Sequence, residues 1–221
     1  MNFFSVEFFI FDIGGWKPSL MEILGVVSGL LTVYLTSRER LSSWPWGMAN
    51  GFFFAVVLFQ VQLYWDTALN VFYLVASAAG WWLWLHPAKQ DPTQDSRGRG
   101  RLGISRVTTT QRWIILAVIF VTTLLGGLVG SQFHLWMPGI FPQPAALPYP
   151  DSFTTAASLG AFFLQLRKKW ESWVIWILVD VVTVAVFYTR GIYLMAWVYG
   201  VFALVAVKGL LHWHKAWKNP Q

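Results

Sequence analysis

Seven apolar stretches alternate with short polar breaks along the chain. They cover residues 19–37, 46–63, 67–85, 113–130, 151–166, 173–188 and 192–211. Most are about 18–20 residues long, the length of helix that crosses roughly 30 Å of hydrocarbon. Because a helix satisfies its backbone polar groups internally in lipid, uniform apolar runs of this length favour helices over strands. The pattern predicts an all-α integral membrane protein with seven transmembrane helices.

The first three stretches return later in the chain. Residues separated by one constant offset of 129 positions are identical or chemically alike. The matched pairs are Arg38 with Arg167, Ser43 with Ser172, Trp44 with Trp173, Tyr64 with Tyr193, Gly80 with Gly209, Trp84 with Trp213 and Glu22 with Asp151. Each group holds three spans, an odd number, so one further span between the groups restores the same orientation. We therefore expect a 3+1+3 arrangement of parallel internal repeats, a transporter architecture whose substrate site lies where the two halves meet.

Composition supports a membrane protein over a soluble domain. Of the 221 residues, 56% are hydrophobic and only 12% are charged, whereas soluble domains carry about 25% charged residues. The 15 Trp residues agree, because Trp gathers at membrane interfaces. The chain has no Cys, which excludes disulfides and thiolate chemistry. Residues 1–18 lack a basic start and contain Glu7 and Asp12, which indicates an interfacial lead-in rather than a signal peptide.

The basic residues indicate the orientation in the membrane. Of the 16 Lys and Arg residues, only Lys17 and Arg190 fall outside the loops and span ends of one face. The positive-inside rule then places the N-terminus outside and the C-terminus in the cytoplasm. Because these cations lie at helix ends and in a polar linker, the net charge of +6 is a topology signal. Nucleic acid is not an expected partner.

These boundaries divide the chain into six parts. They are a lead-in (1–18), a first three-helix repeat (19–86), a cytoplasmic linker rich in Gly, Pro, Thr and Arg (87–112), a linking helix with a Pro-rich periplasmic loop (113–150), a second three-helix repeat (151–213) and a cytoplasmic tail (214–221). The linker is expected to be loop or disorder. The sequence leaves the oligomeric state open, and a homo-oligomer is compatible with it.

Polar residues within the spans form two helix faces. The residues that repeat at steps of three and four are Asp66, Asn70, Tyr73 and Ser77 in one span and Trp173, Trp176, Asp180 and Thr183 in another. A carboxylate about seven residues into a span is costly in lipid, so Asp180 should face the bundle interior or a wet cavity. Asn50 lies at the corresponding depth of the second span once a one-residue slip is allowed. Each of these residues also has a structural alternative to ligand binding. Asn50 and Ser77 could be interhelical hydrogen-bond partners, Tyr73 and Trp176 could be packing residues, and Asp180 could pair with a buried donor.

Enzyme chemistry is not indicated. The sequence lacks the HExxH, GxSxG and P-loop motifs, and its four His residues lie in loops or at span ends. We therefore expect no metal and no other cofactor, and no ATP-driven mechanism. A seven-helix ligand sensor and a membrane-embedded enzyme are the rival classes, and the internal repeat favours a transporter over both.

Several motifs spread over nearly the whole chain resemble one bacterial family. They are WPWGMAN, FQVQLY and GWWLW in the first half and RKKWESWVIW, GIYLMAWVYG and GLLHW in the second. Together they resemble the PnuC-type vitamin transporters, inner-membrane proteins for nicotinamide riboside and, in relatives, thiamine or riboflavin, with a 3+1+3 build like that of the SWEET proteins. The resemblance implies facilitated diffusion with alternating access and no ion or ATP coupling. It also implies that a cytoplasmic vitamin kinase traps the substrate by phosphorylation.

The resemblance further implies a substrate site. Carried over by position, its lining residues are Asn50, Asn70, Tyr73, Ser77, Trp176, Asp180 and Tyr199, with Gly80 and Gly209 at packing positions. Many nicotinamide riboside transporters of this family have Gln in place of Asn70, and Asn in place of both Ser77 and Asp180. A carboxylate among aromatic rings suits an organic cation, and thiamine and nicotinamide riboside are both cations. Because Ser77 cannot form the two-pronged bond that an amide forms, thiamine is slightly favoured and nicotinamide riboside is the alternative.

The distribution of basic residues gives a testable topology. A reporter fused to the C-terminus should be active only where cytoplasmic reporters are active, because 14 of the cations of the chain lie on that face, all except Lys17 and Arg190. Paired cytoplasmic and periplasmic reporters in whole cells measure this. Activity of the periplasmic reporter at the C-terminus would contradict the topology.

Overall fold

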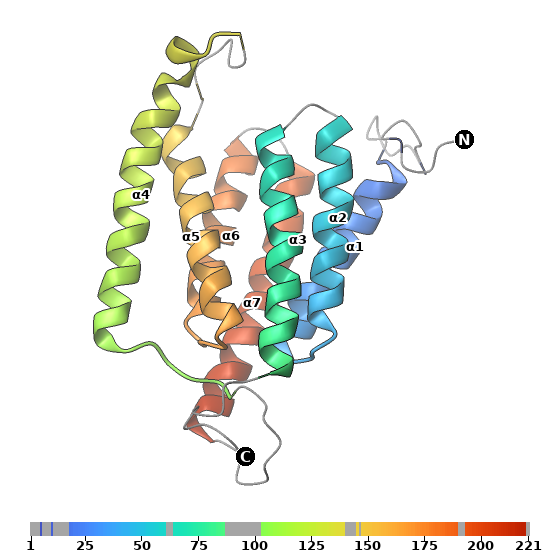
Figure 1. Cartoon of the computed structure of the whole chain (residues 1–221), viewed down its shortest axis with the longest axis vertical. Helices are drawn as coiled ribbons and strands as arrows, with labels where there is room; N and C mark the ends of the chain where they lie inside the picture. Colours follow the sequence, from blue (N-terminus) through green and yellow to red (C-terminus); the bar gives the residue numbers. More distant parts are fainter. Residues whose placement is uncertain are drawn as a thin grey trace. The chain divides into compact units, whose positions relative to one another are not determined.

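The computed structural model describes residues 5, 10, 18–60, 64–86, 103–139, 145, 147–189 and 193–219. Within these residues the chain forms seven helices (Figure 1). They are α1 (Leu20–Ser37), α2 (Ser43–Gln60), α3 (Tyr64–Leu85), α4 (Thr109–Trp136), α5 (Pro148–Leu166), α6 (Ser172–Thr189) and α7 (Tyr193–Lys218). The all-α prediction is confirmed.

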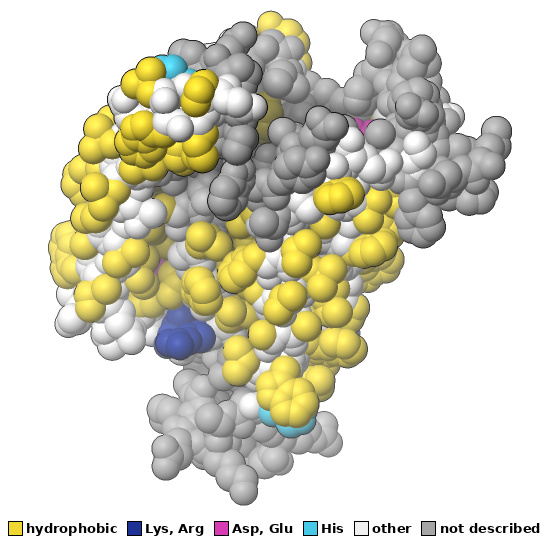
Figure 2. Space-filling model, turned by 45° about the horizontal axis from the view of Figure 1, so that its top comes forward, with side chains coloured by type: hydrophobic (Ala, Val, Ile, Leu, Met, Phe, Trp, Pro, Cys, Tyr) yellow, Lys and Arg dark blue, Asp and Glu magenta, His cyan; other side chains and the backbone are white. Residues whose placement is uncertain are grey.

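Four of the described helical segments are long and apolar enough to cross a membrane. They are Leu20–Ser37, Thr109–Trp136, Ser172–Thr189 and Ala196–Lys218. In α3 the apolar part is the shorter segment Leu69–Leu85. Helix α4 is apolar on most of its surface, and its Trp113, Phe120 and Leu125 side chains are each more than half exposed. On the face drawn in Figure 2, apolar side chains cover most of the described surface and charged ones are few, as lipid contact requires.

The chain separates into two compact units, Met1–Leu102 and Gly103–Gln221. In the first unit, α2 packs against both α1 and α3. In the second unit, α4 packs on α5, α5 packs on α6, and α6 packs on α7. The middle helix of each predicted three-helix group, α2 or α6, therefore contacts both of the other helices of its group.

Helices α4 and α7 extend furthest beyond the apolar runs that predicted them. Helix α4 begins at Thr109 rather than at residue 113, because Thr108 and Gln111 form a capping box that stabilises an earlier start. Helix α7 continues to Lys218, so most of the predicted tail at 214–221 is helical. Its last turn carries Lys215 and Lys218, and cations there interact favourably with the helix dipole.

Helix α5 begins within the Pro-rich stretch that was expected to be loop. Its first residue is Pro148 and Pro150 follows in the first turn. Proline is tolerated there because the first N–H groups of a helix have no partner within the helix. The start at 151 predicted from apolarity alone is therefore three residues late.

The turn between α1 and α2 matches the turn between α5 and α6 at the offset of 129. Glu39 has a φ of 55° and Lys168 a φ of 47°. Before them, the Arg38 N–H donates to the Leu35 carbonyl at 3.1 Å, and the Arg167 N–H donates to the Leu164 carbonyl at 3.2 Å. Both turns thus leave the preceding helix through the same left-handed step.

A pair of tryptophans follows each turn in the same way. The Trp44 and Trp84 rings meet edge to face at 5.1 Å and 88°, and the Trp173 and Trp213 rings meet at 5.5 Å and 87°. All four side chains are buried. These pairs stand at positions that the offset aligns, so local geometry and sequence agree there, while the duplication as a whole stays a prediction.

Gly209 makes room for the second pair. A Cβ added at this glycine would lie 2.8 Å from the Trp173 ring, closer than carbon atoms can approach without movement. The Trp173 side chain is only 1% exposed, so it cannot move aside without disturbing its neighbours. The packing role expected for Gly209 agrees with this contact.

The segment before α4 is fastened to the turn between α5 and α6. The Ser105 N–H donates to the Lys168 carbonyl at 3.1 Å, and the Trp170 N–H donates back to the Ser105 carbonyl at 3.2 Å. The Lys169 Nζ donates to the Arg106 carbonyl at 3.2 Å. Residues 103–108 therefore form an extended loop held by hydrogen bonds, within the linker for which the sequence predicted loop or disorder. Residues 87–102 of that linker lie outside the described residues.

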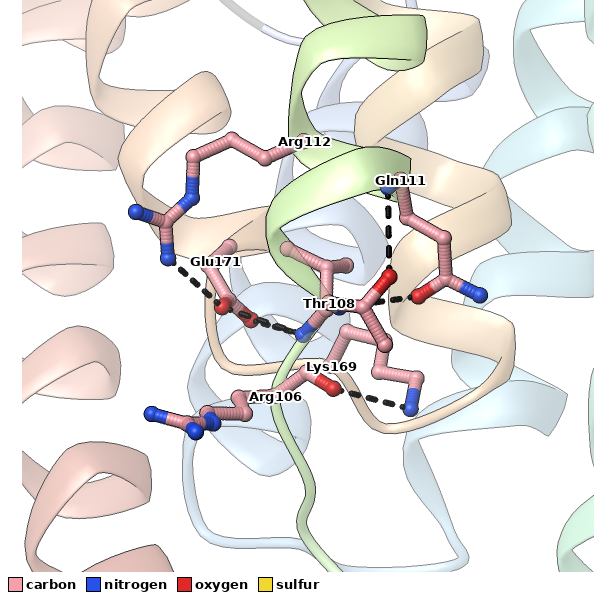
Figure 3. A network of polar contacts seen from close by, with 7 residues as sticks. Arg106, Thr108, Gln111, Arg112, Lys169 and Glu171 are labelled. Carbon is pink, nitrogen blue, oxygen red and sulfur yellow. Dashed lines mark hydrogen bonds and ion pairs between the residues drawn. The ribbon is translucent and has the colours of Figure 1, made fainter.

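Glu171 is the centre of this contact (Figure 3). Its carboxylate oxygens accept the Val107 N–H at 3.1 and 3.2 Å, and the Arg112 guanidinium lies 3.7 Å away. The Glu171 side chain is 11% exposed and the Arg112 side chain 53%. The backbone contact is buried and the ion pair is solvent-screened, so the backbone contact contributes more to stability.

Gly209→Ala should lower the thermal unfolding midpoint in detergent. Forcing a methyl group against the Trp173 ring costs about 1–3 kcal/mol. The matched control is Gly200→Ala on the same helix, where an added Cβ meets no atom within 4 Å. Equal midpoints for the two variants would show that Gly209 is not a close-packing position.

Glu171→Ala should speed hydrogen exchange at the Val107 amide. Removing the Glu171 carboxylate leaves the buried Val107 N–H without an acceptor, at a cost of about 1–3 kcal/mol. Arg112→Ala is the control, because loss of a screened ion pair costs at most about 1 kcal/mol. Mass spectrometry measures the exchange rate of the Val107 amide in both variants. Faster exchange in Arg112→Ala than in Glu171→Ala would contradict the larger role assigned to Glu171.

Candidate functional site

Four of the predicted site residues lie in the first unit, on two closely packed helices. Asn50 is on α2, and Asn70, Tyr73 and Ser77 are on α3. A small residue on α2 permits the approach of α3, since a Cβ added at Gly51 would lie 2.9 Å from the Asn70 carbonyl oxygen. The structure thus brings the polar face of α3 beside the α2 turn that contains Asn50.

The Asn50 side chain is fixed by a contact with α1. Its Nδ2 donates to the Gly25 carbonyl oxygen at 2.8 Å. A carbonyl oxygen only accepts, so the nitrogen of the amide must face α1 and the Oδ1 must face away. Asn50 is half-buried and serves as an interhelical partner, as its structural alternative predicted. Its Oδ1, an acceptor, has no partner among the described residues.

Ser77 is buried where α3 approaches α2. Its side chain is 3% exposed, and its hydroxyl lies 3.0 Å from the position that a Cβ would take at Gly47. In the described part of the chain this hydroxyl makes no hydrogen bond. Asn70 and Tyr73 are half-buried, and the Tyr73 ring lies 5.8 Å from that of Phe72. Asp66 belongs to α3, but its side chain lies outside the described residues.

The other three predicted residues lie in the second unit. Trp176 and Asp180 are one turn apart on α6, and Tyr199 is on α7. The Tyr199 ring packs against the rings of Phe187 at 5.6 Å and Phe202 at 5.7 Å. Asp180 lies within electrostatic range of the Tyr199 phenol. Carboxylate and aromatic rings therefore gather on the α6–α7 side of this unit.

Asp180 is a buried carboxylate without a countercharge. Its side chain is 6% exposed, and among the described residues no hydrogen bond or ion pair involves it. Thr183, on the same face of α6, differs, because its hydroxyl donates to the Val179 carbonyl at 2.8 Å. A charge buried without compensation is costly, so Asp180 is the strongest candidate for contact with a cationic ligand.

Trp176 combines packing with a hydrogen bond. Its ring packs against the core formed by Ile119, Ala157 and Val179. Its Nε1 donates to the Gln165 Oε1 on α5 at 2.7 Å. The sequence analysis missed Gln165, because a polar residue next to the end of an apolar run is usual at a membrane boundary. Its burial, with 8% of the residue exposed, is visible only in the structure.

Of the acidic residues at the two span starts, Glu22 acts through its carboxylate and Asp151 contributes its backbone carbonyl. Glu22 caps α1, accepting from the Ser19 N–H at 2.7 Å and from the Ser19 hydroxyl at 2.9 Å. The Asp151 carbonyl accepts the hydroxyls of Thr154 and Thr155 in the first turns of α5. The described residues contain no group of three or more His, Cys, Asp or Glu that could hold a metal ion.

Comparison with known proteins covers almost the whole chain. The family model described as Nicotinamide mononucleotide transporter matches residues 19–215. The sequence is 29% identical to the Nicotinamide riboside transporter PnuC of Escherichia coli (strain K12), over 96% of this chain and 94% of that protein. It is 23% identical to the Riboflavin/roseoflavin transporter RibM of Streptomyces davaonensis, over 87% of this chain and 83% of that protein.

A solved structure shares the fold. The crystal structure of the Vitamin B3 transporter PnuC matches with a TM-score of 0.66 and 22% sequence identity, and covers 92% of this chain and 84% of that chain. The resemblance to PnuC-type transporters found in the motifs is confirmed. The relatives carry the names of transporters, in agreement with the prediction that the chain is not an enzyme.

Proposed function

Since this chain belongs to the nicotinamide mononucleotide transporter family, we propose that it carries nicotinamide riboside across the bacterial inner membrane. The observation that carries this proposal is the buried carboxylate of Asp180, which no described cation neutralises. The pyridinium ring of nicotinamide riboside supplies one positive charge. Near the aromatic ring of Tyr199, that charge gains both ionic and cation–π attraction.

The charge of Asp180 also separates the candidate substrates of the family. Riboflavin is uncharged and gains nothing from a buried carboxylate. A mononucleotide carries a phosphate, which a nearby carboxylate repels and which is itself costly to bury. The riboside is the form that has the pyridinium charge without the phosphate. The E. coli relative, which is named for the riboside, supports the same choice.

The comparisons favour nicotinamide riboside over thiamine, so the thiamine preference from the sequence is not supported. That preference rested on the loss of an amide at Ser77. Two described amides are each held by one end only: that of Asn50, itself a predicted site residue, and that of Gln165, the partner of Trp176. Each has one side uncommitted among the described residues. An amide can therefore still be recognised without one at position 77.

The proposed transport is facilitated diffusion of the substrate across the membrane by alternating access, with two matched three-helix groups as the moving parts. The matched turns and Trp pairs support two groups that are internal repeats. The residues proposed to contact substrate are Asn50, Asn70, Tyr73 and Ser77 in the first unit and Trp176, Asp180 and Tyr199 in the second. A cytoplasmic kinase then traps the riboside, because phosphorylation adds the charge that the site disfavours.

Flux into liposomes tests the proposal against both rival classes. Purified protein reconstituted into vesicles should equilibrate labelled nicotinamide riboside without ATP and without an ion gradient, in a saturable manner. Protein-free vesicles are the control. Binding without flux would indicate a sensor, and chemical conversion of the label would indicate an enzyme; either result contradicts the proposal.

Asp180→Asn should raise the dissociation constant for nicotinamide riboside by about 5- to 150-fold. This corresponds to the roughly 1–3 kcal/mol that a charge-assisted contact contributes. The control is Asp151→Asn, a change of an exposed carboxylate in the first turn of α5, which should leave the affinity unchanged. Calorimetric titration measures both variants, and an unchanged affinity in Asp180→Asn would remove that residue from the site.

A further inference from the structure

Gln165 is a buried amide that neither sequence motifs nor a predicted role singled out. It is the second-last residue of α5, and only 8% of it is exposed. A buried Gln has one acceptor oxygen and two N–H donors to satisfy. In a membrane bundle, where lipid offers no partner, each must be satisfied by the protein, by water or by a ligand.

The orientation of this amide is determined by Trp176. An indole N–H can only donate, so the group that it meets at 2.7 Å must be the Gln165 oxygen. The Trp176 ring is itself held against the core of Ile119, Ala157 and Val179. Rotating the amide would break the hydrogen bond and leave the part-buried indole N–H unpaired. The Nε2 of Gln165 is therefore directed away from the indole nitrogen.

The two N–H donors on Nε2 have no acceptor among the described residues. Several hydroxyls inside the described helices differ, because they donate to a carbonyl of their own helix, as Ser28 and Thr32 do. The Nε2 is not among the fully buried polar atoms that lack a partner in the described residues, so it is open to an incoming group. The arrangement is that of an accessible donor held in place for an acceptor from outside the two helices.

The amide adjoins the residues already proposed to bind substrate. Trp176, its hydrogen-bond partner, is one helical turn before Asp180 on the same face of α6. Asp180 can attract a cation, but an ionised carboxylate cannot donate a hydrogen bond. Gln165 supplies the missing donor on the same side of the unit.

We propose that Gln165 is a further specificity-determining residue, whose Nε2 donates to an uncharged oxygen of a cationic nucleoside. The carboxamide oxygen and the ribose hydroxyls of nicotinamide riboside are acceptors of this class. This inference rests on the proposed function. It assigns the cation to Asp180 and the neutral acceptor to Gln165.

A double-mutant cycle tests the direct contact against a purely structural role. The variants are Gln165→Met, Trp176→Phe and the double variant, each titrated with nicotinamide riboside. Gln165→Met removes the donors at nearly constant length, and Trp176→Phe removes the indole N–H while leaving Gln165 in place. We expect Gln165→Met to weaken binding by about 5- to 10-fold in the wild-type protein. In the Trp176→Phe background the indole N–H no longer orients the amide, so we expect a smaller loss there, of about 2- to 5-fold.

The alternative gives a different pattern. If Gln165 only orients Trp176, the loss caused by Gln165→Met disappears in the Trp176→Phe background, and this result overturns the inference. Gln132→Met, at an exposed glutamine on α4, is the matched control and should bind like wild type. Thermal midpoints of all variants identify any that fail to fold, and for these Gln165→Asn, a shorter amide, replaces Gln165→Met in the same cycle.

The wild-type titration separates this inference from the proposed function. Absence of riboside binding by the wild-type protein overturns both. Wild-type binding with no additional loss from Gln165→Met in the Trp176→Phe background overturns the role of Gln165 and leaves the proposed function standing.

Discussion

Polar groups buried among apolar helices must find partners within the protein, and this constraint organises the described structure. Lipid offers no hydrogen bonds, so hydroxyls such as those of Ser28 and Thr183 bond to carbonyls of their own helix. Some groups at helix ends, including the Trp173 indole nitrogen, are buried without a partner, and ring packing fixes their position. The Asp180 carboxylate and the Gln165 amide nitrogen, which have no partner among the described residues, are the groups proposed to meet a ligand that is both a cation and an acceptor.

The same constraint explains what the sequence could predict. The seven apolar runs correctly predicted seven helices, because a uniformly apolar run of about 18 residues rarely forms any other structure than a membrane-spanning helix. The depth of Asp180 within its run also sufficed to mark it. Helix ends were less predictable: the capping box at Thr108 starts α4 early, and the amphipathic end of α7 continues to Lys218. Gln165 was missed because burial near a span end depends on the neighbouring helix, which one sequence does not reveal.

Substrate choice was the least predictable feature. The change at Ser77 suggested a different vitamin, although Asn50 and Asn70 remained as amides among the predicted lining residues. The structure holds the Asn50 amide by its nitrogen and the Gln165 amide by its oxygen. Which end of each amide is left uncommitted depends on contacts between helices, so sequence position alone does not predict it.

Matched local geometry links the fold to transport. The left-handed steps at Glu39 and Lys168, and the Trp pairs that follow them, give both three-helix groups the same connection at the end predicted to face the cytoplasm. In the second unit, Glu171 also ties the start of α4 to this connection. Two groups with equivalent ends are suited to alternating access, in which related halves exchange roles.

The account is tested most directly by calorimetric titration of the purified wild-type protein with nicotinamide riboside, thiamine and riboflavin in parallel. It predicts that nicotinamide riboside binds most tightly, because only this ligand combines a pyridinium cation with a carboxamide and ribose hydroxyls. Tighter binding of thiamine would show that charge alone is recognised. Tighter binding of uncharged riboflavin would contradict the role assigned to Asp180.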